Sequence, residues 1–125
     1  MPTTEMPAPP ERRRAMGCHL AAFAGLIPFG HVVAPFLVWQ LLKGDSAFVD
    51  HHGREAVNFQ ITATLGICAI AIVAVVLSGA GLLPVRFLPG VIGATVAGVW
   101  VLSLWAALAA SGGRWIRYPL SFRVL

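Results

Sequence analysis

GLIPFGHVVAP, residues 25–35, breaks an otherwise apolar segment. Pro28 and Pro35 each lack a backbone donor and clash with the preceding turn, and Gly30 lies between them, so a continuous helix is disfavoured here. With a break close to Gly30, segment 15–42 divides into halves of about 20 and 17 Å at about 1.5 Å per residue. Either half is short for a hydrocarbon core of about 30 Å. The segment is therefore either one kinked crossing or a short hairpin that returns to the side where it began.

The positive charges decide between these two topologies. A single crossing divides the nine Lys and Arg residues four to five between the two sides, which gives no orientation. A hairpin leaves Arg86 alone on one side and places the other eight on the side of both termini. The positive-inside rule favours the hairpin. We therefore expect a multi-pass protein of the bacterial inner (cytoplasmic) membrane with both termini in the cytoplasm.

Composition places the chain among membrane proteins. Hydrophobic residues make up 58% of its 125 residues and charged residues 11%, and the mean hydropathy is +0.79. Soluble domains usually carry about 25% charged residues, so a lipid bilayer is the expected surrounding. The net charge of +4 comes from residues that flank apolar runs, which indicates membrane topology rather than a nucleic-acid partner. Cys18 and Cys68 lie in apolar segments without a CxxC spacing, so neither a disulfide nor a zinc site is indicated.

The expected fold is an all-α integral membrane protein, a four-helix bundle. It combines the short Pro/Gly-broken helical hairpin with two full transmembrane helices and an interfacial C-terminal arm. The two full helices contain no charged residue, and at about 1.5 Å per residue they reach roughly 35 and 32 Å. The expected boundaries are a disordered N-terminal tail at 1–14 and a single membrane domain at 15–125, made of hairpin 15–42, cytoplasmic loop 43–55, helices 56–78 and 90–110, and arm 112–125.

The most polar part of the membrane domain is residues 48–60, FVDHHGREAVNFQ. His52 and Glu55 are three residues apart and share a helix face, a spacing that can hold a metal. Gly53 interrupts the turn, however, and the two-histidine metalloprotease pattern is absent. We interpret the stretch as helix capping by Asp50 together with helix packing, and a ligand or proton site is the alternative. We expect no metal, no cofactor and no catalytic residue.

Polar side chains at membrane depth should find partners inside the bundle. Asn58 shares one helix face with Glu55 and Thr62, and Gln60 lies on another face. We expect Asn58 to hydrogen-bond the backbone that the hairpin break exposes. Histidines in the hairpin either line a pathway or satisfy exposed carbonyls. The candidate polar or structural residues are His19, His31, Asp50, His52, Glu55, Asn58 and Gln60.

Two further features indicate what surrounds the helices. Gly90, Ala94 and Gly98 recur every four residues in the last apolar segment and form a ridge that permits close helix contact. We expect this ridge to pack within the chain or to bind a protein partner or a second copy. Trp115 and Tyr118 in the arm have amphipathic rings that anchor proteins at a membrane interface.

Several short features occur together along residues 19 to about 123. They are His19-Leu20, Ile27-Pro28-Phe29-Gly30, Pro35, Trp39, Asp50, His52-Gly53, Glu55-Ala56, Asn58-Phe59-Gln60 and Tyr118-Pro119. With this set the chain resembles a family of small bacterial membrane proteins of unknown function that is related to the twenty-kilodalton membrane subunit of the chloroplast inner-envelope translocon (Tic). The resemblance implies four membrane helices with both ends in the cytoplasm and no known enzyme activity.

Three classes of function follow from these features. No phosphate loop, nucleophile elbow, dinucleotide fingerprint or zinc spacing is present, so an enzyme is the weakest hypothesis. The leading hypothesis is a small membrane protein that acts as a subunit or accessory factor of a membrane complex. The alternative is a homo-oligomeric channel or transporter, with His31 and Asn58 lining a polar site at the broken hairpin. One chain has few helices for a pore, so the alternative requires several copies.

Overall fold

A computed structural model of the chain describes residues 5–26 and 29–125. Within these residues the secondary structure is helical and contains no strand. In chain order the elements are α1 (Pro9–Leu20), the 3-10 helix η1 (Ala21–Leu26), α2 (Gly30–Leu42), α3 (Ala47–Gly79), the 3-10 helix η2 (Val85–Phe87) and α4 (Leu88–Ser111). The all-helical prediction is confirmed, and in the described part of the chain two helices are long and apolar enough to cross a membrane.

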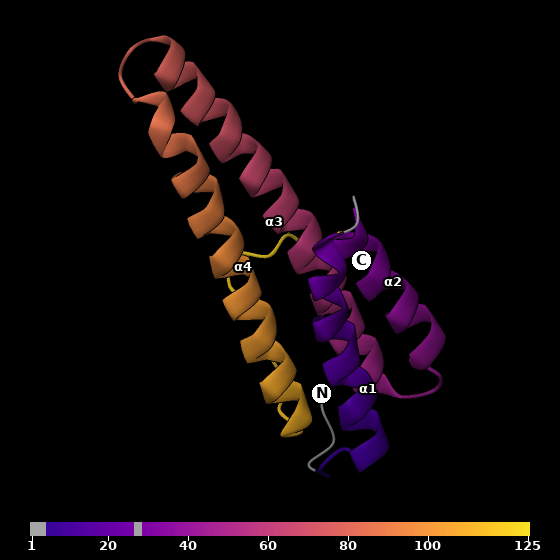
Figure 1. Cartoon of the computed structure of the whole chain (residues 1–125). Coiled ribbons are helices and arrows are strands. Elements are labelled where there is room, and N and C mark those ends of the chain that lie inside the picture. The colour runs from indigo at the N-terminus through magenta and orange to yellow at the C-terminus, as the bar shows by residue number, and fades with distance from the viewer. Residues whose placement is uncertain (1–4, 27–28) are drawn as a thin grey trace.

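Helices α3 and α4 form one long antiparallel pair, and α1 and α2 lie beside only half of it (Figure 1). The 33 residues of α3 span about 50 Å at about 1.5 Å per residue, whereas α1 and α2 have 12 and 13 residues. Phe23 of η1 meets Trp100 at a ring distance of 5.8 Å, and His31 of α2 bonds Thr64. Both contacts lie well short of the loop that joins α3 to α4.

The α1–α2 segment is a hairpin that returns to its starting end. The Ser46 hydroxyl, in the link between α2 and α3, donates to Glu11 Oε1 at 2.6 Å. Arg12 Nη1 in turn donates to the carbonyl of Ser111 at 3.4 Å. The start of α1, the 43–46 link and the end of α4 therefore share one end of the molecule, called the near end below. The 80–87 loop, which contains Arg86, forms the far end.

The first turns of two helices lie where we expected irregular chain. Glu11 accepts the N–H of Ala8 at 2.8 Å, which stabilises the beginning of α1, so residues 9–14 are helical and the prediction of a tail to residue 14 was wrong. Residues 1–4 lie outside the described residues. Helix α3 begins at Ala47 because the Ser46 hydroxyl accepts the N–H of Val49 at 3.3 Å. Residues 47–55, which we expected in a loop, are therefore the first turns of α3.

The turn between α1 and α2 differs in one respect from the predicted break. Phe29 has a left-handed backbone with φ of 59°, and α2 begins immediately after it. Pro28, to which we assigned part of the break, lies outside the described residues. Pro35 is inside α2 and does not end it, because one lost backbone bond is tolerated in a helix that packs tightly on α3. The assignment of Pro35 to the break was therefore wrong.

Close packing of α2 on α3 depends on Gly53. A Cβ atom at this position would lie 2.0 Å from Cδ1 of Trp39, so only glycine allows the indole to rest directly on the α3 backbone. Trp39 is 4% exposed and joins a core cluster with Cys18, Val49 and Val57. Gly53 thus serves helix packing and does not interrupt the helix, contrary to our interpretation of the sequence.

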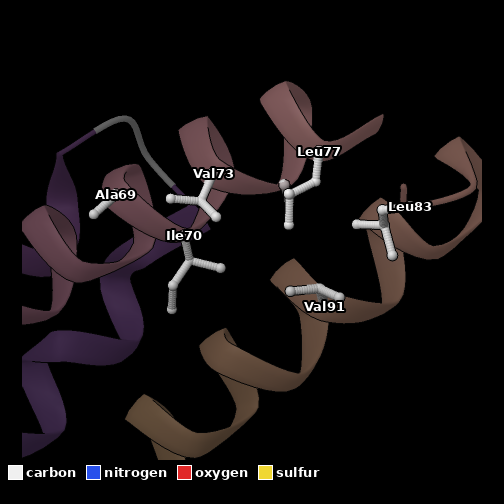
Figure 2. A pocket seen from close by; sticks show the side chains of 7 residues that line it. Ala69, Ile70, Val73, Leu77, Leu83 and Val91 are labelled. Atoms are coloured by element: carbon white, nitrogen blue, oxygen red, sulfur yellow. The ribbon is translucent and has the colours of Figure 1, made fainter. Parts of the chain in front are cut away.

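Nearly all of the core lies toward the near end. Within residues 65–79, all of which the structure describes, only Ala74 is buried. Near the far end the two long helices leave an apolar groove of about 340 Å³ between them. Figure 2 shows Ile70, Val73 and Leu77 of α3 across this groove from Val91 of α4. The molecule is therefore well packed in one half and open in the other.

Candidate functional site

The residues after α4 form an extended arm, residues 112–125, that side chains of α3 bind through its backbone. His52 Nε2 donates to the carbonyl of Arg114 at 3.0 Å, and His51 Nε2 donates to the carbonyl of Ile116 at 2.7 Å. One turn further along α3, Glu55 Oε2 accepts the N–H of Tyr118 at 3.0 Å. The polar stretch at the start of α3 is thus a binding surface for the arm.

Asn58 and Thr62 continue this surface, as expected from the face that they share with Glu55. Oδ1 of Asn58 accepts the N–H groups of Val124 and Leu125, both at 3.0 Å. The Thr62 hydroxyl accepts the N–H of Phe122 at 2.9 Å. The prediction that Asn58 bonds the hairpin backbone was wrong, because the side-chain oxygen of Asn58 accepts hydrogen bonds from the arm instead. Tertiary contact over more than sixty residues, which no local pattern shows, determines this partner.

A chain of buried polar side chains lies beneath the arm. Tyr118 Oη lies 3.0 Å from His19 Nδ1, and His19 Nε2 lies 2.9 Å from His52 Nδ1. Both imidazoles are 0% exposed and Tyr118 is 5% exposed. The carbonyl of Arg114 ends the chain at His52 Nε2. Three segments of the molecule, α1, α3 and the arm, therefore meet at one hydrogen-bonded line.

The carbonyl at the end of this line determines where the protons lie. A carbonyl only accepts, so His52 carries its proton on Nε2 and its Nδ1 accepts. His19 Nε2–H then donates to that Nδ1, which leaves His19 Nδ1 to accept the Tyr118 hydroxyl proton. Every donor and acceptor in the line is used when both rings are neutral. Burial is the main reason that the pKa of His19 falls from 6.5 to about 3, and the neighbouring His52 and His51 lower it further.

Tyr118 lies in the core instead of anchoring the chain at a membrane interface. Its ring stacks on Phe59 with centroids 3.9 Å apart and an interplanar angle of 5°. Burial raises the pKa of Tyr118, so the hydroxyl remains protonated and available as a donor. Trp115, the other expected anchor, packs edge-on against Phe48 at 5.2 Å. Both rings fasten the arm to the body of the protein.

Asp50 has a different role from the capping that we expected. It lies within the first turn of α3, while Ser46 is the cap. Its Oδ1 accepts the indole N–H of Trp39 at 3.0 Å, and its Oδ2 accepts Nε of Arg54 at 2.9 Å. The guanidinium of Arg54 and the ammonium of Lys43 lie 5.7 and 5.3 Å from the Trp39 ring centre. Asp50 therefore orients the tryptophan that packs on Gly53.

Two predicted residues, His31 of α2 and Gln60 of α3, lie apart from the buried line and close to the tip of the hairpin. His31 Nε2 donates to the Thr64 hydroxyl at 2.8 Å, and Gln60 Nε2 donates to the Ser103 hydroxyl at 3.0 Å. These residues surround a cavity of about 210 Å³ together with Trp100. Sequence reasoning missed Ser103, although an isolated serine in the apolar run of α4 is the signal that would have identified a partner for Gln60.

The network as a whole performs structural chemistry. In residues 5–26 and 29–125, no three His, Cys, Asp or Glu side chains are grouped as metal ligands. Both ring nitrogens of His19 and of His52 are engaged within the chain. The carboxylate of Glu55 and the amide of Asn58 are likewise committed to arm backbone. The arrangement holds an extended peptide against a helix through backbone hydrogen bonds, while the side chains of Trp115 and Tyr118 pack in the core.

The small-residue ridge of α4 divides into two parts. Gly90, Ala94 and Gly98 are exposed, and a Cβ atom added at Gly90 or Gly98 would meet nothing within 4 Å. Ala106 and Ala110, further along the same helix, are 0% exposed and pack in the near-end core. The exposed part of the ridge therefore makes no close contact with the described residues of its own chain.

Comparison with known proteins identifies the family. A family model described as the magnetosome magnetite crystal formation protein family (MamF/MmsF) matches residues 10–125. Neither the curated proteins nor the solved structures contain a match. The family match overturns the resemblance to the translocon-related family. The residues that carried that resemblance, among them His19, His52 and Tyr118, build the arm-binding network and indicate nothing about protein translocation. The chain belongs to the magnetosome magnetite crystal formation protein family.

Proposed function

We propose that this chain is a non-catalytic integral membrane component that acts in magnetite crystal formation by associating with other membrane proteins. The observation that carries the proposal is the far half of the α3–α4 pair. Its side chains are apolar and exposed, with Ile72 at 64%, Val76 at 63% and Val91 at 37%. Such a surface is unstable in water and is matched by lipid or by other apolar helices.

Charge supports an orientation for the inserted protein. All Lys and Arg residues except Arg86 lie on α1, the 43–46 link, the first turns of α3 or the arm. These segments belong to the near end, so the positive-inside rule places that end and both termini in the cytoplasm. Cysteines introduced at Asp45 and at Leu82 should then react with an impermeant thiol reagent from opposite sides of the membrane. Labelling of both from one side would contradict the crossing by α3 and α4.

The exposed ridge is the proposed contact surface for a partner. Gly90, Ala94 and Gly98 lie on an apolar helix face where a second helix could approach closely. Either another protein of the same membrane or a second copy of this chain fits this chemistry. Membrane association of this kind needs no reactive side chain. This agrees with the polar network, whose His19, His52, Glu55 and Asn58 side chains are hydrogen-bonded within the chain.

The decisive experiment is genetic complementation. Deleting the gene should change the size or number of magnetite crystals seen by electron microscopy, and the wild-type chain should restore them. The double variant Gly90→Leu, Gly98→Leu should insert normally but fail to restore the crystals, because leucine fills the ridge. Gly79→Leu is the matched control, since Gly79 is also exposed with nothing within 4 Å and does not line the groove beside Gly98. Unchanged crystals in the deletion strain would refute the proposal.

A single chain gives little support to the channel or transporter alternative. A polar cavity does exist at the hairpin tip, where His31 and Gln60 lie. Beyond it, residues 65–77 of α3 contain Cys68 as their most polar side chain. A conducting path to the far end would therefore require polar groups from other copies. Ion flux from liposomes that contain the purified oligomer would favour this alternative over association.

A further inference from the structure

The two halves of the molecule differ in cross-section. In the near half, α1, α2 and the arm lie beside α3 and α4 (Figure 1). In the far half α3 and α4 stand alone among the described residues, with the apolar groove of Figure 2 between them. A helix with its side chains is about 10 Å wide, so each additional helix adds about 80 Å² of cross-section. The near half is therefore wider by about two helices.

The position of the bilayer along α3 and α4 follows from length. A hydrocarbon core of about 30 Å accommodates about 20 helical residues at about 1.5 Å each. Counted from Gly79, the end of α3, this length reaches Phe59. Counted from Pro89 on α4, it reaches Ala109. The arm-binding residues Glu55 and Asn58 then lie just outside the hydrocarbon, at the near boundary.

The hairpin reaches only part of the way into this layer. Its contact with Thr64, five residues beyond Phe59, lies about 8 Å inside the core, and its contact with Trp100 lies about 14 Å inside. One leaflet contributes about 15 Å of hydrocarbon. The tip of the hairpin therefore ends within the near leaflet, and the far leaflet contains α3 and α4 alone.

The outer face of α2 is suited to contact with that leaflet. Val33, Leu37 and Leu41 point away from the protein with exposures of 49%, 51% and 80%. The helix ends at Leu42, and the ammonium of the next residue, Lys43, lies against the Trp39 ring, as expected in the lipid headgroup region. Lipid therefore has an apolar surface to cover on the hairpin, and the added cross-section displaces acyl chains from one leaflet only.

We propose that this chain is a membrane wedge that favours bilayers in which the leaflet containing the α1–α2 hairpin is convex. The inference rests on the membrane insertion proposed above and adds a function to it, namely a preference for curved membranes. A convex leaflet has more area per lipid at its surface than the opposite leaflet, which accommodates the two additional helices of the near half. Insertion into one leaflet gives shallow amphipathic helices their sensitivity to curvature in the same way.

Single-vesicle fluorescence tests the wedge. The full-length chain, labelled at its N-terminus, is reconstituted into phosphatidylcholine–phosphatidylglycerol vesicles of mixed diameter, and protein per lipid is measured vesicle by vesicle. We expect about twofold or greater enrichment on the most curved vesicles over the flattest ones. Trypsin added outside the most curved vesicles should cut at Arg117 and Arg123 of the near end, because that end should face outward. Equal density at all diameters would overturn the wedge.

Two double variants separate the wedge from insertion itself. Val33→Gln, Leu37→Gln makes polar the exposed face of α2 that is nearest the hairpin tip. No buried contact is removed, so the hairpin should withdraw from the leaflet and the enrichment should be lost. Leu82→Gln, Val85→Gln is the matched control, because these side chains are 74% and 72% exposed at the far end, and it should keep the enrichment. Enrichment that survives in the α2 variant would refute the wedge.

Failure of the underlying proposal has a separate signature. If the chain does not insert through α3 and α4, alkaline carbonate will extract it from vesicles of every diameter. In that case both the wedge and the proposed function are wrong. A chain that resists carbonate but shows no dependence on diameter overturns the wedge alone.

Discussion

His19 Nε2 on α1 lies 2.9 Å from His52 Nδ1 on α3, and both rings are completely buried. Two adjacent imidazoles remain neutral here because the line that contains them begins at a donor, the Tyr118 hydroxyl, and ends at an acceptor, the Arg114 carbonyl. The direction of all the hydrogen bonds follows from these two ends. The pair therefore joins the arm to the helices within the near-end core.

Replacing His19 should release the arm. His19→Leu leaves the Tyr118 hydroxyl and His52 Nδ1 without partners, and a buried unsatisfied group costs about 1–3 kcal/mol. We expect the variant to be destabilised by about 2 kcal/mol or more and trypsin to cut faster at Arg117. His31→Leu is the control, because it removes a bond at the hairpin tip and should leave cleavage of the arm unchanged. Equal cleavage in His19→Leu and wild type would contradict the arm-binding role of the line.

Acid should weaken the contact between His19 and the arm. The pKa of His19 is lowered to about 3 in the folded chain from 6.5, so between these values the unfolded or released state binds more protons. The stability that neutral His19 contributes is complete above about pH 6.5 and is lost as the pH falls toward 3. At pH 5 the loss is on the order of 2 kcal/mol. Thermal unfolding in detergent from pH 7.5 to pH 4.5 should show a falling midpoint.

Other titratable groups lie close to His19, so a control variant is needed. His52 and Tyr118 bond it directly, His51 lies beside His52, and Glu55 bonds the arm next to them. His19→Gln keeps a polar side chain that has no charge to gain at these pH values. The slope of the unfolding midpoint against pH should be smaller in this variant, and an identical slope would assign the pH dependence to the other groups.

Replacing Asn58 should loosen the arm and leave the hairpin unchanged. Asn58→Leu removes the acceptor of two backbone N–H groups, those of Val124 and Leu125. Hydrogen exchange of residues 118–125 should become faster by roughly tenfold, the equivalent of about 1.4 kcal/mol, while residues 30–35 exchange as in wild type. Gln40→Leu, at an exposed position of α2, is the control for added hydrophobicity. Faster exchange confined to the hairpin would contradict the observed geometry.

Gly53 should tolerate no larger residue. In Gly53→Ala the new methyl group meets Trp39 at 2.0 Å, so either the indole or α2 must move, and overpacking of this kind costs about 1–3 kcal/mol. Gly66→Ala, on the same helix with nothing within 4 Å, should instead stabilise the protein by about 0.5–1 kcal/mol through helix propensity. Opposite shifts of the unfolding midpoint are expected. A neutral Gly53→Ala would show that α2 is not closely packed on α3.

The long helices could be predicted because their signal is local. An uncharged apolar run long enough to span a bilayer predicted most of α3 and α4, and charge placement predicted that the α1–α2 segment returns to its starting end. The first turns of α3 could not be placed, since their polar side chains are buried by an arm more than sixty residues away. Tyr118 was misassigned for the same reason, because an amphipathic ring suits an interface or a core equally well until its partner is known.

The arm is recognised through its main chain, and this has a consequence for which substitutions the protein tolerates. Phe122 and Val124 offer backbone N–H groups to α3 while their side chains remain 67% and 64% exposed. Almost any residue supplies the same N–H, so mutational scanning should find these positions permissive. Proline is the exception, because it has no N–H to offer. The side chains of Thr62 and Asn58, which accept these N–H groups, have no such freedom. Substitutions should therefore be tolerated less on α3 than in the arm that it binds.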